Sequence, residues 1–223
     1  MKRLLVLALI LVLTSCGANK FLTSSVTPSQ ISKLSYLEPV SYIQRIEKGN
    51  KSAFSDSLST LTKTALDSLL QKNSAKFRLS QQLVFPNDTI KNKVEIELSS
   101  IAQQIFQKRK LDGIALTPAI DSLIESNGER FALSVVATGF GRRKGNYGGQ
   151  VAKGAAIGIL TLGMYTPVPI KSNLTLYAFI FDAEKNEVAY YKMVPPVEKE
   201  PTDPEVIDKQ LQELFKGYFY EEK

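Results

Sequence analysis

Two long stretches with helical periodicity limit most strongly what this chain can fold into. They run over residues 52–72 and 88–108, and each places its apolar side chains on a single stripe. Such a stripe must be buried against another element, so each stretch predicts a long helix packed on a core. The first stripe is Phe54, Leu58, Leu61, Ala65 and Leu69, and the second is Ile90, Val94, Leu98, Ile101 and Ile105.

Segments with β-strand character surround these helices. Residues 131–140 have strong β-strand character, with Phe131, Leu133, Val135 and Ala137 on one face, which predicts a central strand. Near the C-terminus, two alternating runs flank a polar turn, which is typical of a β-hairpin. The predicted strands are residues 34–47, bent near Pro39, then 77–84, 131–140 and the hairpin arms 173–181 and 187–194.

Two further helices complete the pattern. A short one is predicted over residues 118–126, and a C-terminal one over residues 203–220, where Asp203 and Pro204 form an N-cap and a first helical position. The predicted fold class is α/β or α+β, with a sheet of about five strands on which the two long helices and the C-terminal helix pack. We expect one domain, at residues 33–223.

The N-terminus has the composition of an export signal. Two basic residues precede an unbroken apolar run at positions 4–13, and small residues lead from that run to Cys16. The run is too short to cross a bilayer as a helix, which takes about 20 apolar residues. Residues 1–15 are therefore predicted to be a cleaved signal peptide.

The sequence Leu-Thr-Ser-Cys-Gly around Cys16 resembles the lipobox of bacterial lipoproteins. The resemblance implies that Cys16 is lipidated and becomes the N-terminus of the mature protein. It is the one cysteine of the chain, so no disulfide within a monomer competes for it. Several acyl chains would hold the protein on its membrane, since each buried methylene contributes about 0.8 kcal/mol. Residues 16–32, rich in Ser and Thr, are then predicted to be a flexible tether.

The residues after the cysteine bear on which membrane is reached. Gly17 stands where lipoproteins held at the inner membrane of enterobacteria tend to have aspartate, and residues 17–20 lack the acidic residues typical of surface-exported lipoproteins of Bacteroidota. These resemblances imply an outer-membrane anchor with the domain on the periplasmic face. The inner membrane and the cell surface stay as alternatives.

The composition of the chain argues against several classes of catalytic and metal site. The chain has no histidine, so the commonest general base, the commonest metal ligand and the usual nucleophilic triads are missing. We predict a protein that is not an enzyme and uses no cofactor or metal. The net charge of +6 is modest and spread along the chain, which argues against nucleic-acid binding. The alternative is a protein that binds or hydrolyses cell-wall or polysaccharide material through two carboxylates, about 5 to 9.5 Å apart in a cleft.

A glycine-rich insertion at residues 141–170 is the most unusual part of the chain. Its glycines are mixed with an apolar run, although each interior glycine costs a helix roughly 0.5 to 1 kcal/mol relative to alanine. Gly154 and Gly158 have the G-x-x-x-G spacing that allows two helices to approach closely. Three interpretations stay open: packing on the domain's own sheet, a self-association or partner surface, and insertion of an oligomer into a membrane.

Three consecutive cations open this insertion. Arg142, Arg143 and Lys144 stand beside the apolar run, where a contact with phosphate-bearing lipid is worth testing, although solvated side chains are the commoner interpretation of such a group. We take them, together with Gly154 and Gly158, as candidate contacts to a partner or to lipid.

The order of elements, the lipobox and the hairpin sequence FIFDAEKNEVAYY resemble periplasmic lipoprotein domains of three types. These are the curli-secretion-channel type, the penicillin-binding-protein-activator type and the N-terminal domain of TolB. The resemblance implies a non-catalytic, membrane-anchored envelope lipoprotein that acts as a protein-interaction or assembly module. In the curli-type family, insertions from many protomers build a β-hairpin pore; residues 141–170 lack the alternating polar pattern of such strands. An oligomeric, membrane-inserting secretion component stays as a further alternative.

Overall fold

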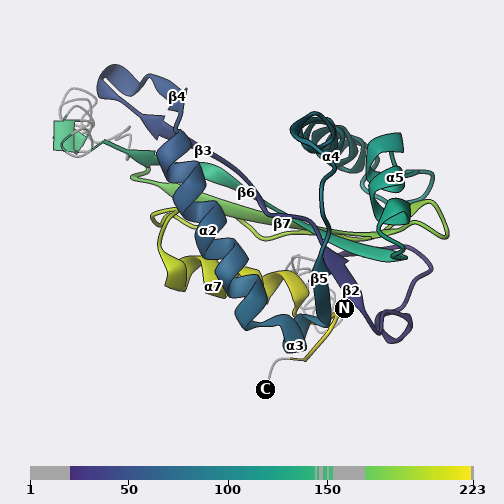
Figure 1. Cartoon of the computed structure of the whole chain (residues 1–223). Helices are drawn as coiled ribbons and strands as arrows, with labels where there is room; N and C mark the ends of the chain where they lie inside the picture. The colour runs from purple at the N-terminus through teal and green to yellow at the C-terminus, as the bar shows by residue number, and fades with distance from the viewer. Residues whose placement is uncertain (1–20, 144, 146–147, 150, 153–168, 222–223) are drawn as a thin grey trace, which may run out of the picture.

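The computed structural model describes residues 21–143, 145, 148–149, 151–152 and 169–221 (Figure 1). Cys16, Lys144, Gly154 and Gly158 lie outside the described residues. The described strands are β1 (Leu22–Thr23), β2 (Leu34–Tyr36), β3 (Val40–Ile46), β4 (Ser52–Phe54), β5 (Leu79–Gln82), β6 (Phe131–Arg142), β7 (Asn173–Asp182) and β8 (Glu187–Met193). The helices are η1 (Pro28–Gln30), η2 (Lys48–Asn50), α2 (Asp56–Lys72), α3 (Ser74–Phe77), α4 (Asp88–Lys108), α5 (Pro118–Ser126) and α7 (Pro204–Phe215).

All eight strands join one mixed sheet with the order β1-β8-β7-β6-β2-β5. The strand β6 is central: it runs parallel to β2 and then to β3, and antiparallel to β7 on its other side. The interruption at Pro39 separates β2 from β3, so the predicted bent strand is two strands in line along β6. The strand β4 pairs with β3 alone.

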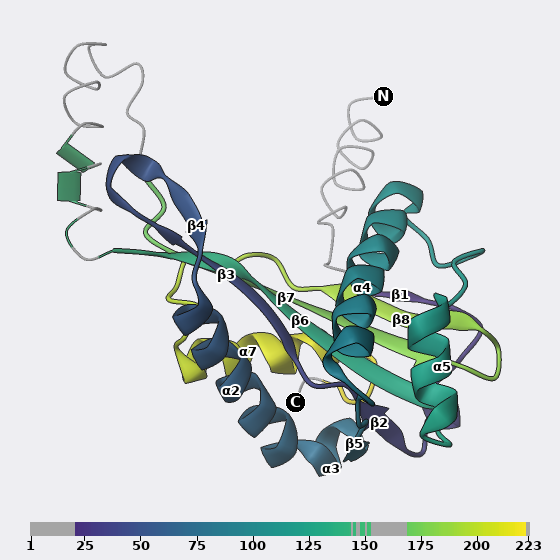
Figure 2. The same ribbon diagram turned by 45° about the horizontal axis from the view of Figure 1, so that its top comes forward.

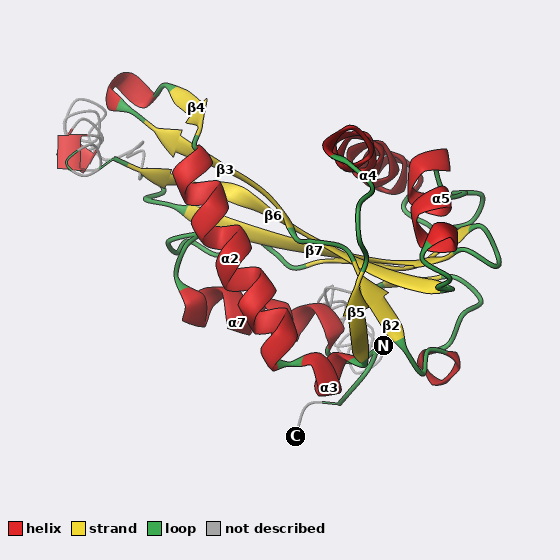
Figure 3. Cartoon of the chain, viewed as in Figure 1, coloured by secondary structure: helices red, strands yellow, loops and turns green. Residues whose placement is uncertain are grey.

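Helices cover both faces of this sheet (Figure 3). On one face α2 and α7 enclose a core that includes Leu133, Val135 and Tyr190. On the other face α4 and α5 enclose a second core that includes Phe179, Phe181 and Val188. The alternation of β6 and β7 explains this division, since successive side chains of a strand point to opposite faces.

The predicted fold class is confirmed as mixed α/β of the α+β kind, but the strand count was too low. The sheet has eight strands because the bent strand divides in two and the short strands β1 and β4 were not foreseen. The helices α4 and α5 begin and end at the predicted residues. The C-terminal helix ends earlier than predicted, at Phe215.

The predicted buried stripe of the first long helix is wrong by a small rotation. Its start, residues 52–54, is the strand β4, and Leu61 is 58% exposed. The buried positions of α2 are Ser59, Thr62, Leu66 and Leu70. Both hydroxyls are satisfied there: Ile43 N donates to Ser59 Oγ at 2.9 Å, and Thr62 Oγ1 donates to the carbonyl of Pro201 at 3.0 Å. Polar residues can therefore occupy the inner face.

The predicted tether is in large part folded. Leu22 and Thr23 pair with β8 at the edge of the sheet (Figure 2), and the ring of Phe21 lies 5.5 Å from that of Tyr190. Val26 and Ile31 are buried in the core beneath α2 and α7. Residues 21–32 therefore belong to the domain, because they carry apolar side chains that the sheet edge and the core can bury.

One end of the sheet extends beyond the helices that cover it. The strands β3 and β6, with the hairpin to β4, project away from α4 and α5 toward the start of the glycine-rich insertion (Figure 1). We call this end, residues 45–54, 141–143 and 170–171, the tip.

Candidate functional site

An open groove lies between α4 and the sheet. The helices α4 and α5 cover one end of their face of the sheet and leave the part nearer the tip uncovered (Figure 1). A cavity of about 400 Å³ lies at the edge of the area that these helices cover. Its volume is in the range of ligand-binding pockets. Its lining residues are Val40, Tyr42, Glu95, Leu98, Ser99, Ala102, Gln103, Phe106, Val136, Thr138, Tyr177, Phe179, Tyr191 and Met193.

The register of the sheet builds the floor of the groove. Val40 stands opposite Val136, Val136 opposite Tyr177, and Tyr177 opposite Met193, so these four side chains form one row across β3, β6, β7 and β8. Directly opposed residues of a sheet share a face, which is why one row presents four apolar groups to the same space. Tyr42 and Thr138 form the next row toward the tip.

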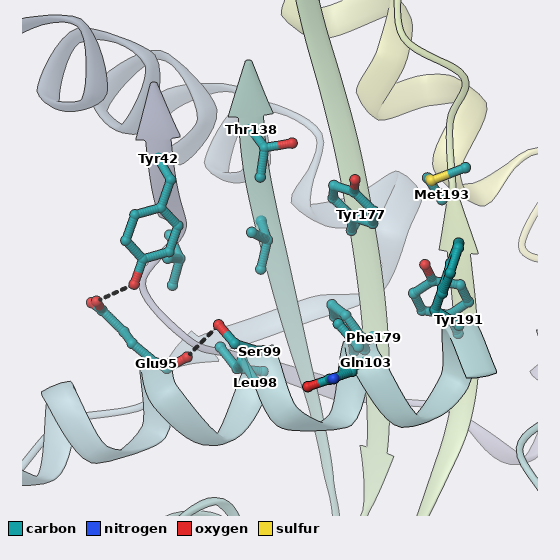
Figure 4. Close-up of a pocket in the computed structure, with 14 residues that line it drawn as sticks. Tyr42, Glu95, Leu98, Ser99, Gln103, Thr138, Tyr177, Phe179, Tyr191 and Met193 are labelled. Carbon is teal, nitrogen blue, oxygen red and sulfur yellow. Dashed lines mark hydrogen bonds between the residues drawn. The ribbon is translucent and has the colours of Figure 1, made fainter. Parts of the chain in front are cut away.

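The helix α4 supplies the wall. Its core stripe, which includes Leu98, packs on the sheet, and the neighbouring stripe faces the groove. Figure 4 shows Glu95, Ser99 and Gln103 of that stripe on one side of the space and Tyr42, Thr138 and Tyr177 of the strands on the other.

Three of the polar residues that line the groove are hydrogen-bonded to one another. The hydroxyl of Tyr42 donates to Glu95 Oε2 at 3.0 Å, and Ser99 Oγ donates to the backbone carbonyl of Glu95 at 3.2 Å (Figure 4). Burial, together with the bond to Glu95, raises the pKa of Tyr42 to about 12. Burial, reinforced by Tyr177, raises the pKa of Tyr191 to about 12. Both phenols stay protonated at neutral pH, so neither is an activated nucleophile.

The apolar lining is accessible from solvent. Tyr42 is 40% exposed, Met193 37% and Phe106 64%. Contiguous exposed apolar surface of this kind marks interaction sites on soluble domains.

The carboxylate alternative needs two acids in one cleft. The groove is lined by one, Glu95, and a smaller cavity between α4 and α5, bounded by Pro86, Lys93 and Pro118, is lined by none. Within the described residues, no three Asp, Glu, Cys or His side chains are grouped to hold a metal ion. Neither cavity therefore offers the pair of acids that this alternative requires.

One carboxylate outside the groove holds two helices together. Glu38 follows β2 and forms ion pairs with Lys63 of α2 at 2.5 Å and Lys91 of α4 at 2.6 Å. Burial alone would raise the pKa of Glu38, but the hydrogen bonds and charges of the two lysines outweigh it and hold the pKa below 4.5. Asp67 lies nearby, and burial and the charge of Glu38 raise its pKa.

We expect Glu38→Gln to lower the free energy of unfolding by about 1 kcal/mol at pH 7, because each partly exposed ion pair contributes little. Since the pKa of Glu38 is lowered by folding, its contribution is present above the ordinary pKa of 4.5 and is lost as the pH falls through the lower, folded value. Urea unfolding of both proteins across this range measures the difference. A difference that persists unchanged in acid would contradict the role assigned to Glu38.

The predicted contact residues that are described lie at the tip and not in the groove. Arg142 donates from Nε to the carbonyl of Ile170 at 2.7 Å and from Nη1 to Asn50 Oδ1 at 2.8 Å. Arg143 forms an ion pair with Glu47 at 3.3 Å. The other predicted contacts, Lys144, Gly154 and Gly158, and the lipidation site Cys16 lie outside the described residues.

The groove itself was missed by the sequence patterns. Tyr177 and Tyr191 pack partly on the core and also line the groove, and the alternation of their strands does not indicate this second role. One signal was available: Phe106 lies off the core stripe of α4, and a large aromatic residue on an outer face has no packing role of its own.

Comparisons with known proteins show a distant likeness in structure. No protein-family model matches the chain, and no curated protein matches its sequence. A dodecamer of a singly substituted PelC from Paraburkholderia phytofirmans is similar over 88% of this chain and 93% of that one, with 8% identity and a TM-score of 0.41. A second PelC dodecamer from the same organism matches over 92% and 97%, with 6% identity and a TM-score of 0.40. Similarity at this level transfers no function to this chain.

Within the part of the chain that the structure describes, no helix combines the length and the apolar composition that crossing a bilayer requires.

Proposed function

We propose that this protein is a non-catalytic envelope lipoprotein, anchored through Cys16, whose domain binds an apolar segment of a protein partner in the groove between α4 and the sheet. The observation that carries the proposal is the groove: a space of about 400 Å³ lined mainly by apolar and aromatic side chains, in which the side chains of Tyr42 and Ser99 are hydrogen-bonded to Glu95.

A protein segment suits this groove better than an enclosed small molecule. Small-molecule sites bury most of the ligand in a concave pocket, whereas here Phe106 is largely exposed and Tyr42 is partly exposed. A helix or strand that presents aliphatic or aromatic side chains would cover this whole surface. Aromatic residues in such a groove are the usual energetic centre of a protein interface.

Photo-crosslinking in cells tests the proposal. A photoreactive amino acid at Gln103, an exposed residue of the groove wall, should form an adduct with one protein partner in the anchored, full-length protein. Adding Ala102→Trp should fill the groove and reduce the adduct at least about tenfold, since an occluded anchor pocket costs more than 1.4 kcal/mol.

The matched control is Thr60→Trp, which places the same side chain on an exposed position of α2, on the other face of the sheet. It should leave the adduct unchanged, and both variants should keep the melting temperature of the parent. An adduct that survives Ala102→Trp would rule out the groove as the site. Recovery of a bound lipid with no protein adduct would do so as well. An adduct to a second copy of this chain would identify the partner as self.

A further inference from the structure

The tip carries a cationic surface that three separate segments of the chain supply. Its cations are Arg45 of β3, Lys48 and Lys51 of the β3–β4 hairpin, Arg142 and Arg143 at the end of β6, and Lys171 where the chain returns. Sequence inspection indicated the pair at the end of β6, but not the cations that the fold places beside it.

Pairing and hydrogen bonds hold these segments together. Arg142 stands opposite Ile46 in the β3–β6 ladder, and Arg45 stands opposite Gly141. The guanidinium of Arg142 joins the hairpin at Asn50 to the returning chain at Ile170. The cations therefore lie at one end of the sheet, with Arg45 and Arg142 on its opposite faces.

Carboxylates neutralise this surface only in part. Glu47 pairs with Arg143, and Glu200 lies 3.9 Å from Lys171. Asp56 stands in the first turn of α2, where it complements the helix N-terminus. Among the described residues, Lys48 and Lys51 form no ion pair, and the guanidinium groups of Arg45 and Arg142 donate to neutral oxygens. Four positive charges are thus left without a carboxylate.

Exposed apolar side chains accompany the charge. Phe54, on the edge strand β4, is 61% exposed, and Ile170 is 41% exposed. A soluble anion would need only the cations, whereas a surface that combines cations with protruding apolar groups matches the headgroup region of a bilayer, which is anionic above an apolar layer.

We infer that the tip binds a membrane surface that contains anionic lipids. The cations would lie among the headgroups, with Phe54 and Ile170 directed toward the acyl boundary. This contact is separate from the groove, and it would set how the anchored domain lies on its membrane.

Vesicle binding tests the inference on a chain that begins at Gly17 and so lacks the acyl anchor. Both hydrophobic cores are built from residues 21 onward, so this form retains every described contact. It should sediment with vesicles of phosphatidylcholine and phosphatidylglycerol, and bind those of phosphatidylcholine alone far more weakly. Added salt should weaken the binding, because exposed charges are screened over about 10 Å at 0.1 M.

The decisive variant is Lys48→Gln with Lys51→Gln, since both side chains are exposed and unpaired and their loss should not disturb the fold. Binding to the anionic vesicles should fall about thirtyfold, from roughly fivefold for each basic residue near the surface. The control Lys93→Gln with Lys209→Gln removes two exposed lysines of α4 and α7 and should leave binding unchanged. Circular dichroism checks that both variants are folded.

Three results would overturn the inference: equal binding to both kinds of vesicle, an equal loss in the control pair, or binding to soluble polyglutamate without binding to anionic vesicles. Since the test uses neither the groove nor the lipid on Cys16, its failure would leave the proposed function standing, and failure of the groove experiment would leave this inference standing.

Discussion

Cys16→Ser should release the protein from its membrane. The proposed anchor is a lipidated N-terminal cysteine, and serine cannot form the thioether that carries the diacylglycerol. Two acyl chains give stable attachment where one gives only marginal binding, at about 0.8 kcal/mol for each buried methylene. Among chains that have lost residues 1–15, we therefore expect the membrane-bound fraction to fall from nearly all to a small part after a high-salt wash, which also removes binding by the tip.

Mass spectrometry of the intact protein completes this test. The parent should carry acyl chains on a chain that begins at Cys16, and the serine variant should carry none. Gly17→Ala keeps the cysteine and serves as the control. If the serine variant stays on the membrane through the salt wash with residues 1–15 removed, the anchor is elsewhere and the lipoprotein interpretation is wrong.

Gly139→Ala should be the most destabilising conservative change in the sheet. Gly139 lies in β6 opposite Leu174, and a Cβ atom built on it would stand 2.2 Å from the carbonyl oxygen of Asn173. The same atom would also lie 3.2 Å from the Cα of Leu174, so the obstacle is backbone and no rotamer change relieves it. Overpacking of this kind costs about 3 kcal/mol.

Thermal unfolding measures the effect. For a chain of this size, a loss of that magnitude lowers the melting temperature by on the order of 10 °C. The control is Gly149→Ala, where an added Cβ meets nothing within 4 Å. Equal stability of the two alanine variants would show that β6 and β7 can move apart without cost. Because Thr138 lines the groove next to Gly139, the Gly139 variant should also weaken groove binding.

Elements whose information is local could be predicted. The helix α4 has its N-cap, apolar stripe and basic last turn within one stretch, and its predicted bounds are those of the structure. The hairpin of β7 and β8 is likewise local, because its alternation and its turn lie side by side in the sequence.

Elements that depend on partners distant in the sequence could not be predicted. The strand β1 has two residues and exists because β8, far along the chain, offers a free edge. The inner face of α2 is set by Ser59 and Thr62, whose hydroxyls find partners on Ile43 and Pro201. No propensity of serine or threonine indicates that such partners will be present.

The groove and the tip likewise depend on contacts between segments that are distant in the sequence. Val40, Val136, Tyr177 and Met193 come from three distant parts of the chain and meet only through strand register. The unpaired cations of the hairpin become a surface only because β3 lies beside β6. Charge and periodicity show what each segment can do, whereas the site depends on which segments become neighbours.

The docking of β1 on the edge of the sheet turns the proposed anchor into a short hinge. From Cys16 to Phe21 the chain can span at most about 18 Å, at ~3.6 Å for each residue. Phe21 directly precedes Leu22, which is paired with Tyr191 of β8. Tyr191 is paired with Phe179 of β7, and Phe179 is paired with Ser134 of β6. From Ser134 the strand runs about 26 Å further to Arg142, at ~3.3 Å for each residue. The tip is thus about 26 Å from the hinge, whereas the hinge can lie at most about 18 Å from the bilayer. If the tip touches lipid, the strands must therefore be tilted from the membrane normal. This tilt sets the direction in which the groove opens.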